Sequence, residues 1–147
     1  MKVYIAGKIW TDSEREMLEK IDLMCKSLNL QTFLPHRDVG FAESVKDAKK
    51  IFDGDIIEGF KGISLVIASL DGLHVGAGTA WELGYAYVKG IPAIGIKTDE
   101  TVEDAFEYLS SILIIAGGNP LASNWVIIIS RPTLPLPSKK GCIASNS

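Results

Sequence analysis

Candidate strands alternate with helix-like segments along this chain, and this alternation restricts the fold more than any other feature of the sequence. The candidate strands lie at residues 3–6, 31–34, 65–70, 92–96 and 125–129. Strands that alternate with helical patterns are typical of βαβ units, in which helices connect parallel strands. The sequence therefore predicts an α/β protein whose sheet has about five parallel strands.

Four helices are expected between these strands. The first follows Thr11, because Thr11 and Glu14 have the spacing of a capping box. Apolar residues recur in it at intervals of three and four, which predicts that one face packs on the sheet. These residues are Met17, Leu18, Ile21, Met24, Cys25 and Leu28. The other expected helices cover residues 41–61, with an interruption at Gly54, residues 79–89 and residues 101–115.

Right-handed crossovers and the compact size favour a flavodoxin-like doubly wound sheet with strand order 2-1-3-4-5 and helices on both faces. Ligands of such folds bind at the carboxyl ends of the strands, where the strand order reverses. That point lies here between the first and third strands, so the turns after them are expected to line one cleft. Residues distant in sequence then meet: Tyr4, Gly7, Lys8 and Trp10 from the first turn, and Asp71, Gly76 and Glu82 from the third.

The length of 147 residues fits one domain, which buries roughly 70% of the surface of its unfolded chain. We expect this domain to cover residues 1–131, and residues 132–147, which are rich in proline, lysine and serine, to form a loose C-terminal tail. A net charge of -3 gives no sign of a surface for nucleic acid. With neither a signal segment nor an apolar run of membrane-spanning length, we expect a cytoplasmic protein without a membrane partner. Cys25 and Cys142 form neither a metal cluster nor a disulfide framework.

Glu82 is the main candidate for chemistry, because it opens a helix straight after an apolar strand and a glycine-rich turn. The turn lacks the Gly-Lys-Ser/Thr ending of a P-loop, and Gly76-x-Gly78 without a third glycine is a poor dinucleotide fingerprint. A carboxylate at this edge of the sheet indicates a ligand other than a pyrophosphate. The alternative is that Glu82 is only a first-turn acid favoured by the helix dipole.

Four blocks of the sequence, in order, carry a family resemblance. They are Tyr4-Ile5-Ala6-Gly7; Phe33-Leu34-Pro35-His36-Arg37-Asp38; Asp55 ahead of a strand ending Leu70-Asp71-Gly72; and Gly78-Thr79-Ala80-Trp81-Glu82-Leu83-Gly84-Tyr85-Ala86. Over about residues 3 to 97 the chain resembles the nucleoside 2-deoxyribosyltransferase family, and the last block is the most specific. The resemblance implies cleavage of the N-glycosidic bond of 2'-deoxynucleosides and transfer of deoxyribose to another base.

The resemblance also implies roles for three residues. Glu82 matches the nucleophile, which attacks C1' and forms a covalent deoxyribosyl ester that a base or water resolves with net retention. Asp55 matches the acid that protonates the departing base, although its segment is one residue longer here, and Tyr4 matches a residue that holds the nucleophile. Two carboxylates in one cleft repel, so one of them is expected to hold a proton near neutral pH. The chemistry implies no metal and no organic cofactor.

Two departures from the family pattern bear on the substrate. Gly76 stands where nucleoside-specific members carry an aspartate that contacts the sugar, and Lys8 stands where transferases usually have proline. Both changes favour a 5'-phosphate, because a negative charge is lost and a cationic donor is gained. The resemblance further implies that an asparagine, Asn124 as the first candidate and Asn119 as the second, reaches the sugar of a neighbouring subunit, which predicts a homodimer or a larger homo-oligomer. The expected substrate-binding residues are Gly7, Lys8, Trp10, Asp71, Gly76, Gly78 and Asn124.

Alternatives remain at the level of function and of single residues. The protein is a deoxyribosyltransferase, a hydrolase that releases the base of (deoxy)nucleoside 5'-monophosphates, or a non-catalytic nucleotide-binding module on the same fold. Structural roles are also open: a solvated helix residue for Asp55, a turn cap for Asp71, a buried strand aromatic for Tyr4, and a solvated cation for Lys8 with Gly76 serving only the turn. Trp10 either stacks on the base, as aromatic faces do, or forms a hydrophobic staple or core contact.

Overall fold

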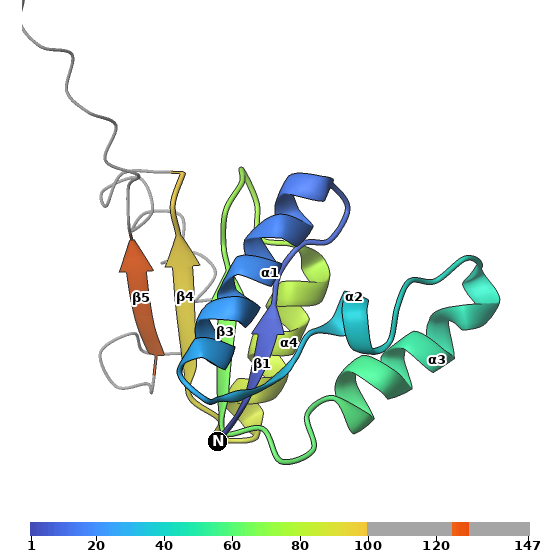
Figure 1. Cartoon of the computed structure of the whole chain (residues 1–147). Helices are drawn as coiled ribbons and strands as arrows, with labels where there is room; N and C mark the ends of the chain where they lie inside the picture. The colour runs from blue at the N-terminus through green and yellow to red at the C-terminus, as the bar shows by residue number, and fades with distance from the viewer. Residues whose placement is uncertain (100–124, 130–147) are drawn as a thin grey trace, which may run out of the picture.

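The computed structural model describes residues 1–99 and 125–129, and the strands of these residues form one parallel sheet (Figure 1). The strands are β1 (Lys2–Ala6), β2 (Gln31–Phe33), β3 (Leu65–Ser69), β4 (Ala93–Lys97) and β5 (Trp125–Ile129). Their order is β2-β1-β3-β4-β5, and every neighbouring pair is parallel. The predicted flavodoxin-like order 2-1-3-4-5 is therefore confirmed.

The first helix, α1 (Asp12–Ser27), begins at the predicted capping box. Thr11 Oγ1 accepts from the backbone N–H of Glu14 at 3.2 Å, and Glu14 Oε2 accepts from the backbone N–H of Thr11 at 2.9 Å. The apolar face of α1 is narrower than predicted, because Met24 and Leu28 are 68% and 70% exposed. The buried side chains of the helix are Leu18, Ile21, Asp22 and Cys25.

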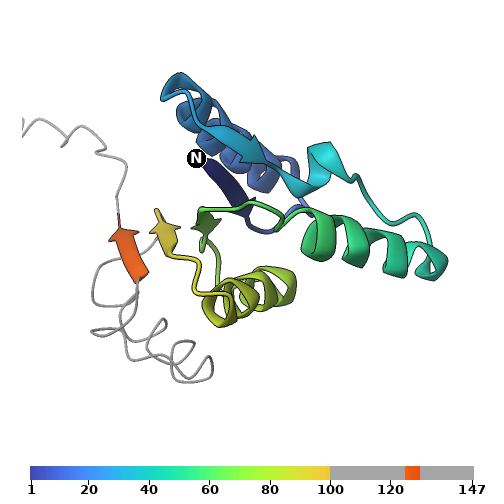
Figure 2. The ribbon, with the colours of Figure 1, turned by 90° about the horizontal axis from the view of Figure 1, so that it is seen from below.

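Side chains of β1 alternate between two cores, as the period of a strand requires. Val3 and Ile5 pack with Leu18 and Ile21 of α1 on one face. Tyr4 and Ala6 point to the opposite face, which is covered by α4 (Ala77–Val88) and by the segment before β3; the buried residues there include Ile56, Phe60, Val66, Ala68, Leu83 and Ala86. Seen from below, the blue α1 and the yellow-green α4 lie on opposite sides of the sheet (Figure 2). Helices on both faces are thus confirmed.

The segment between β2 and β3 is less regular than the single interrupted helix expected at residues 41–61. It contains α2 (Pro35–Asp38), the 3-10 turn η1 (Val45–Asp47), α3 (Ala48–Phe52) and the π-helical η2 (Asp53–Glu58). The predicted interruption at Gly54 coincides with the change from α to π winding. A Cβ atom at Gly54 would lie 2.6 Å from Val39 Cγ1, so only glycine fits there without displacing its neighbour. Short π segments inside helices often mark functional sites.

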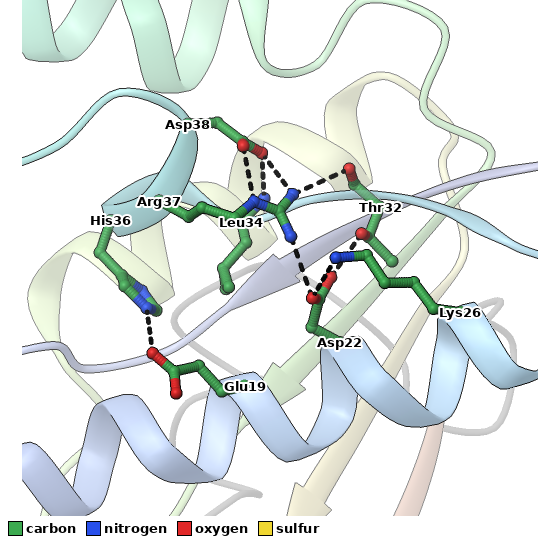
Figure 3. Close-up of polar contacts among 8 residues, drawn as sticks. All are labelled: Glu19, Asp22, Lys26, Thr32, Leu34, His36, Arg37 and Asp38. Carbon is green, nitrogen blue, oxygen red and sulfur yellow. Dashed lines mark hydrogen bonds and ion pairs between the residues drawn. The ribbon is translucent and has the colours of Figure 1, made fainter.

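A polar cluster holds α2 against α1 and β2 (Figure 3). Arg37 Nη1 donates to Asp22 Oδ2 at 2.9 Å, and the guanidinium also donates to both oxygens of Asp38 at 2.7 Å. Asp38 in turn accepts from the backbone N–H of Leu34 at 2.8 Å. Burial alone raises the pKa of Asp22, but hydrogen bonds from Lys26, Thr32 and Arg37 bring that pKa below its ordinary value. The Leu-Pro-x-Arg-Asp block is therefore a structural motif that fixes the backbone around Pro35.

Several expectations lie outside the described residues: the helix at 101–115, Asn119, Asn124, Cys142, the domain boundary at residue 131 and the tail at 132–147. In the described part of the chain, no helix combines the length and the apolar character needed to span a membrane.

Candidate active site

Glu82 and Tyr4 form a hydrogen-bonded pair across two elements that lie far apart in sequence. The Tyr4 hydroxyl donates to Glu82 Oε1 at 2.8 Å. Tyr4 is fully buried in β1, and its ring packs against Phe60 with centroids 4.3 Å apart and against Phe33 with centroids 5.3 Å apart. Burial and the neighbouring carboxyl groups of Glu82 and Asp55 raise the pKa of Tyr4, so the hydroxyl stays protonated and remains a donor. The aromatic packing therefore aims a permanent hydrogen-bond donor at Glu82.

The position of Glu82 on its helix argues against the alternative that it is only a first-turn acid favoured by the helix dipole. Helix α4 begins at Ala77, two residues earlier than predicted, so Glu82 lies beyond its first turn. The first turn itself contains no acidic residue. The favourable interaction of a carboxylate with the helix dipole is largely limited to that first turn. Glu82 is instead half-buried and engaged by Tyr4.

Asp55 lies in the π-helical segment η2 and is the second carboxyl group of the site. Its Oδ1 atom is buried and has no hydrogen-bond partner among the described residues. Burial raises the pKa of Asp55 to about 6. Buried polar atoms without partners are rare in native proteins, so Asp55 Oδ1 is available to a ligand.

The two carboxyl groups titrate as a pair. The pKa of Glu82 is raised to about 8, because burial and, to a smaller extent, the charge of Asp55 raise it more than the hydrogen bond from Tyr4 lowers it. Between the pKa of Asp55 at about 6 and that of Glu82 at about 8, the pair carries one proton. One proton and one negative charge are what a nucleophile and an acid share in glycosyl transfer.

A first hollow of about 330 Å³ brings together most of the predicted site residues. Both carboxyl groups border it, as does Pro35, which the polar cluster around Arg37 positions. The predicted residues that line it are Gly7, Lys8, Trp10, Asp55, Gly76, Gly78 and Glu82. Tyr4 is not among the residues that line this hollow, but its hydroxyl donates a hydrogen bond to Glu82, which does line it. Trp10 is 82% exposed, so it is no core contact.

A second hollow of about 310 Å³ borders the same carboxyl groups. It is lined by Phe52, Asp55, Ile56, Gly78, Trp81 and Glu82. Phe52, Ile56 and Trp81 are not among the site residues expected from the sequence. Phe52 precedes Asp55 by three residues, which is a helical spacing that places both on one side. That spacing is a signal from which its proximity could have been predicted.

Lys8 lies along the glycine-rich turn between β3 and α4. A Cβ atom at Gly76 would lie 2.8 Å from Lys8 Cγ, and one at Gly72 would collide with Lys8 Nζ. Gly72 also has φ 98°, a conformation that favours glycine. The ammonium group lies 3.5 Å from Glu14. The two departures from the family pattern are therefore one structural change, because an aspartate at position 76 would meet the Lys8 side chain.

Asp71 is not brought to Glu82. Its two oxygens accept from Thr98, one from the backbone N–H and one from the hydroxyl, both at 2.6 Å. Asp71 borders a separate, smaller hollow of about 180 Å³ beside Lys8. These contacts tie the end of β3 to the end of β4. A ligand contact of Asp71 remains a prediction.

Comparison with known proteins places the chain in a family. A model of the nucleoside 2-deoxyribosyltransferase family matches residues 3–113. The chain belongs to this family. Its members transfer or hydrolyse glycosyl groups and act on nucleoside substrates, which confirms the general class of enzyme expected from the sequence. No curated protein sequence matches the chain.

Three solved structures share the fold of this deoxyribosyltransferase family member. A conserved protein from Enterococcus faecalis V583 is 24% identical, with a TM-score of 0.60 over 88% of this chain and 81% of that one. A 2-deoxyribosyltransferase from Bacillus psychrosaccharolyticus is 24% identical, with a TM-score of 0.59 over 69% of this chain and 77% of that one. A CMP N-glycosidase from Clostridium botulinum is 19% identical, with a TM-score of 0.55 over 88% of each chain.

Proposed function

We propose that this protein cleaves the N-glycosidic bond of 2'-deoxynucleosides and transfers the deoxyribosyl group to another base. The main support is the hydrogen bond of 2.8 Å from a fully buried tyrosine, Tyr4, to Glu82, in a hollow that Asp55 also lines. A carboxylate held by a fixed donor is a suitable nucleophile, and a second carboxyl group beside it is a suitable acid.

The reaction has two displacement steps. Glu82 attacks C1', the bond from C1' to the base nitrogen breaks, and its electron pair leaves with the base, which takes a proton from Asp55. A deoxyribosyl ester of Glu82 remains. An incoming base then attacks C1' while the ionised Asp55 accepts its proton, and the carboxylate of Glu82 is released. Two inversions give net retention at C1'.

Substrate binding has to move the proton of the carboxyl pair. Without substrate, the pKa of Glu82 at about 8 lies above that of Asp55 at about 6, so near neutral pH the proton resides on Glu82. Attack requires it on Asp55. We propose that the base, a hydrogen-bond acceptor beside Asp55 Oδ1, draws the proton to Asp55, while the Tyr4 hydroxyl stabilises the charge left on Glu82.

The first test is product analysis on a panel of 2'-deoxynucleosides with and without adenine as acceptor. We expect a new deoxynucleoside to form only when the acceptor is present, and Glu82→Ala to abolish it. Glu16→Gln, a change at an exposed position of α1, is the matched control and is expected to leave turnover intact. Unchanged turnover in Glu82→Ala would remove the nucleophile from the proposal.

Hydrolysis of (deoxy)nucleoside 5'-monophosphates is the second candidate function, and the Lys8 side chain supports it. Lys8 borders the hollow that holds Glu82, and its side chain lies over Gly76, a position without a carboxylate. Its ammonium group is 3.5 Å from Glu14, so a bound phosphate would compete with Glu14 for it. We expect Lys8→Met to raise KM for a 5'-monophosphate and to leave KM for the parent deoxynucleoside nearly unchanged. Turnover of the unphosphorylated compound that equals or exceeds that of its monophosphate would contradict this candidate.

We also propose that the protein is a cytoplasmic homo-oligomer in which Asn124 reaches the sugar bound by a neighbouring subunit. Light scattering is expected to give a dimer or a larger assembly. Asn124→Ala should raise KM without changing that mass. A chain ending at residue 131 should keep its activity if residues 132–147 are a loose tail. A monomeric, fully active protein would contradict the shared site.

A further inference from the structure

The second carboxyl group of the site, Asp55, lies in a turn of unusual winding. The backbone N–H of Gly59 donates to the carbonyl oxygen of Gly54 at 2.8 Å, across the π-helical segment η2 that contains Asp55. A hydrogen bond between residues five apart is that of a π turn, whereas an α-helix joins residues four apart. The segment therefore holds one residue more than an α-helical turn between the same two ends.

This winding places Asp55 and Phe60 on one side of the segment. Residues i and i+4 share a face of an α-helix, and residues i and i+5 do so where the hydrogen bonds run over five residues. Phe60 is buried, and its ring lies against that of Tyr4 with centroids 4.3 Å apart. Asp55 borders both hollows together with Glu82, which accepts from Tyr4. The carboxyl group and the ring that anchors its segment thus both lie beside the Tyr4–Glu82 pair.

Both ends of the π hydrogen bond are glycines in close contact with their surroundings. A Cβ atom at Gly59 would collide with the carbonyl oxygen of Asp55 and lie 2.6 Å from Phe33 Cε1. One at Gly54 would lie 2.6 Å from Val39 Cγ1. The turn is therefore held between β2 and the end of α2, and a larger residue at either end would displace a packed neighbour.

We propose that this π turn positions the general acid: it absorbs one additional residue between Asp55 and Phe60, so that Asp55 faces the hollows while Phe60 stays packed on Tyr4. Gly54 and Gly59 are then positioning residues. This inference rests on the proposed function, and it explains why the segment after Asp55 can be one residue longer than in the family pattern. An α-wound turn with the additional residue would rotate Asp55 by about 100° relative to Phe60 and take the acid out of the hollows.

Removal of the additional residue is the first test. Deletion of Ile57, which is 46% exposed and lines neither hollow, leaves Asp55 and Phe60 four residues apart, as α winding requires. We expect this variant to stay active and to have a melting temperature within about 4 °C of that of the original protein. Deletion of Lys20, an exposed residue of α1, is the matched control. It turns the helix from Ile21 onward by about 100° away from the core, so its melting temperature should fall by more than about 10 °C.

The opposite change should misplace the acid. With one alanine inserted after Ile57, neither winding brings Asp55 and Phe60 to one side, so the variant should behave like Asp55→Asn. Both variants should lose roughly 10²- to 10⁴-fold in kcat on 2'-deoxyguanosine, whose base departs with a proton from the acid. Both should turn over 7-methyl-2'-deoxyguanosine almost as the original protein does, because that base is already cationic and departs without a further proton.

Four results would overturn the inference. They are a deletion of Ile57 that destabilises as much as deletion of Lys20, a deletion of Ile57 that loses only 2'-deoxyguanosine, a folded insertion variant with the turnover of the original protein, and a folded insertion variant that loses both substrates equally. If circular dichroism shows that the insertion variant is unfolded, the deletion of Ile57 decides alone. If Glu82→Ala leaves turnover unchanged, the proposed function fails, while the melting temperatures still test the winding because they need no turnover.

Discussion

Replacing Glu82 by glutamine is expected to stabilise the protein at alkaline pH. The carboxyl group has an ordinary pKa of 4.5, and burial raises this to about 8 in the folded state. Between these values the folded protein binds a proton that the unfolded chain has released. The contribution of this carboxyl group to stability is therefore fully present below pH 4.5 and is lost as the pH rises to about 8. Glutamine carries no charge at any of these pH values and keeps an oxygen that accepts from Tyr4.

The size of this effect follows from the two pKa values. The difference between about 8 and 4.5 is 3.5 pKa units, and at about 1.4 kcal/mol for each unit the upper limit is roughly 5 kcal/mol. Glu82 is half-buried rather than fully enclosed, and water near the charge reduces the penalty of ionisation. We therefore expect Glu82→Gln to raise the free energy of unfolding by about 2–4 kcal/mol at pH 8.5 relative to its effect at pH 4.5.

Urea unfolding followed by tryptophan fluorescence measures this difference. The titrations are run at pH 4.5 and at pH 8.5 with equal protein concentrations, because oligomerisation makes apparent stability depend on concentration. Glu16→Gln, at an exposed position of α1, is the control and is expected to show a difference near zero between the two pH values. A Glu82→Gln effect that is the same at both pH values would refute the conclusion that burial holds a proton on this carboxyl group.

Three further predictions concern Tyr4, the Asp55–Glu82 pair and Asp22. Tyr4→Phe keeps the buried ring and loses the 2.8 Å hydrogen bond to Glu82. Because a hydrogen bond to a charged group contributes roughly 1.5–3 kcal/mol, steady-state kinetics should show kcat/KM reduced about 10- to 100-fold. An unchanged kcat/KM would contradict the role of Tyr4. The pH profile of kcat/KM should be bell-shaped with limbs near about 6 and about 8, because the active form carries one proton on the Asp55–Glu82 pair; a flat profile across this range would contradict the shared proton. Asp22→Asn should destabilise the protein by about 1–3 kcal/mol at pH 7, where the ionised carboxylate binds Lys26, Thr32 and Arg37. Because these partners hold the pKa of Asp22 below its ordinary 3.8, that loss should shrink as the pH falls below this value, and a loss that is independent of pH in urea titrations would argue against the ionic contacts.

The sequence by itself determined the order of strands and helices. Two of these features are local: the alternation of strand and helix patterns and the capping box at Thr11 and Glu14 are set by neighbours within a few residues. The break at Gly54 was predicted from the glycine itself, although the contact that requires glycine there comes from Val39. The parallel order 2-1-3-4-5 then followed from the handedness of the crossovers. The buried face of α1 was not determined in this way, because Met24 and Leu28 are exposed while Asp22 is buried by its contacts with Thr32 of β2 and Arg37 of α2.

Only the tertiary structure decided how the site residues relate to one another. The bond between Tyr4 and Glu82 joins residues 78 positions apart, and it depends on the register of β1 and β3 and on the packing of α4. The same packing left Asp55 Oδ1 without a partner among the described residues, placed Lys8 over Gly72 and Gly76, and engaged Asp71 with Thr98. Burial, proton affinity and the shape of a hollow arise from atoms that several segments contribute together, and for this reason no local pattern of residues contains them.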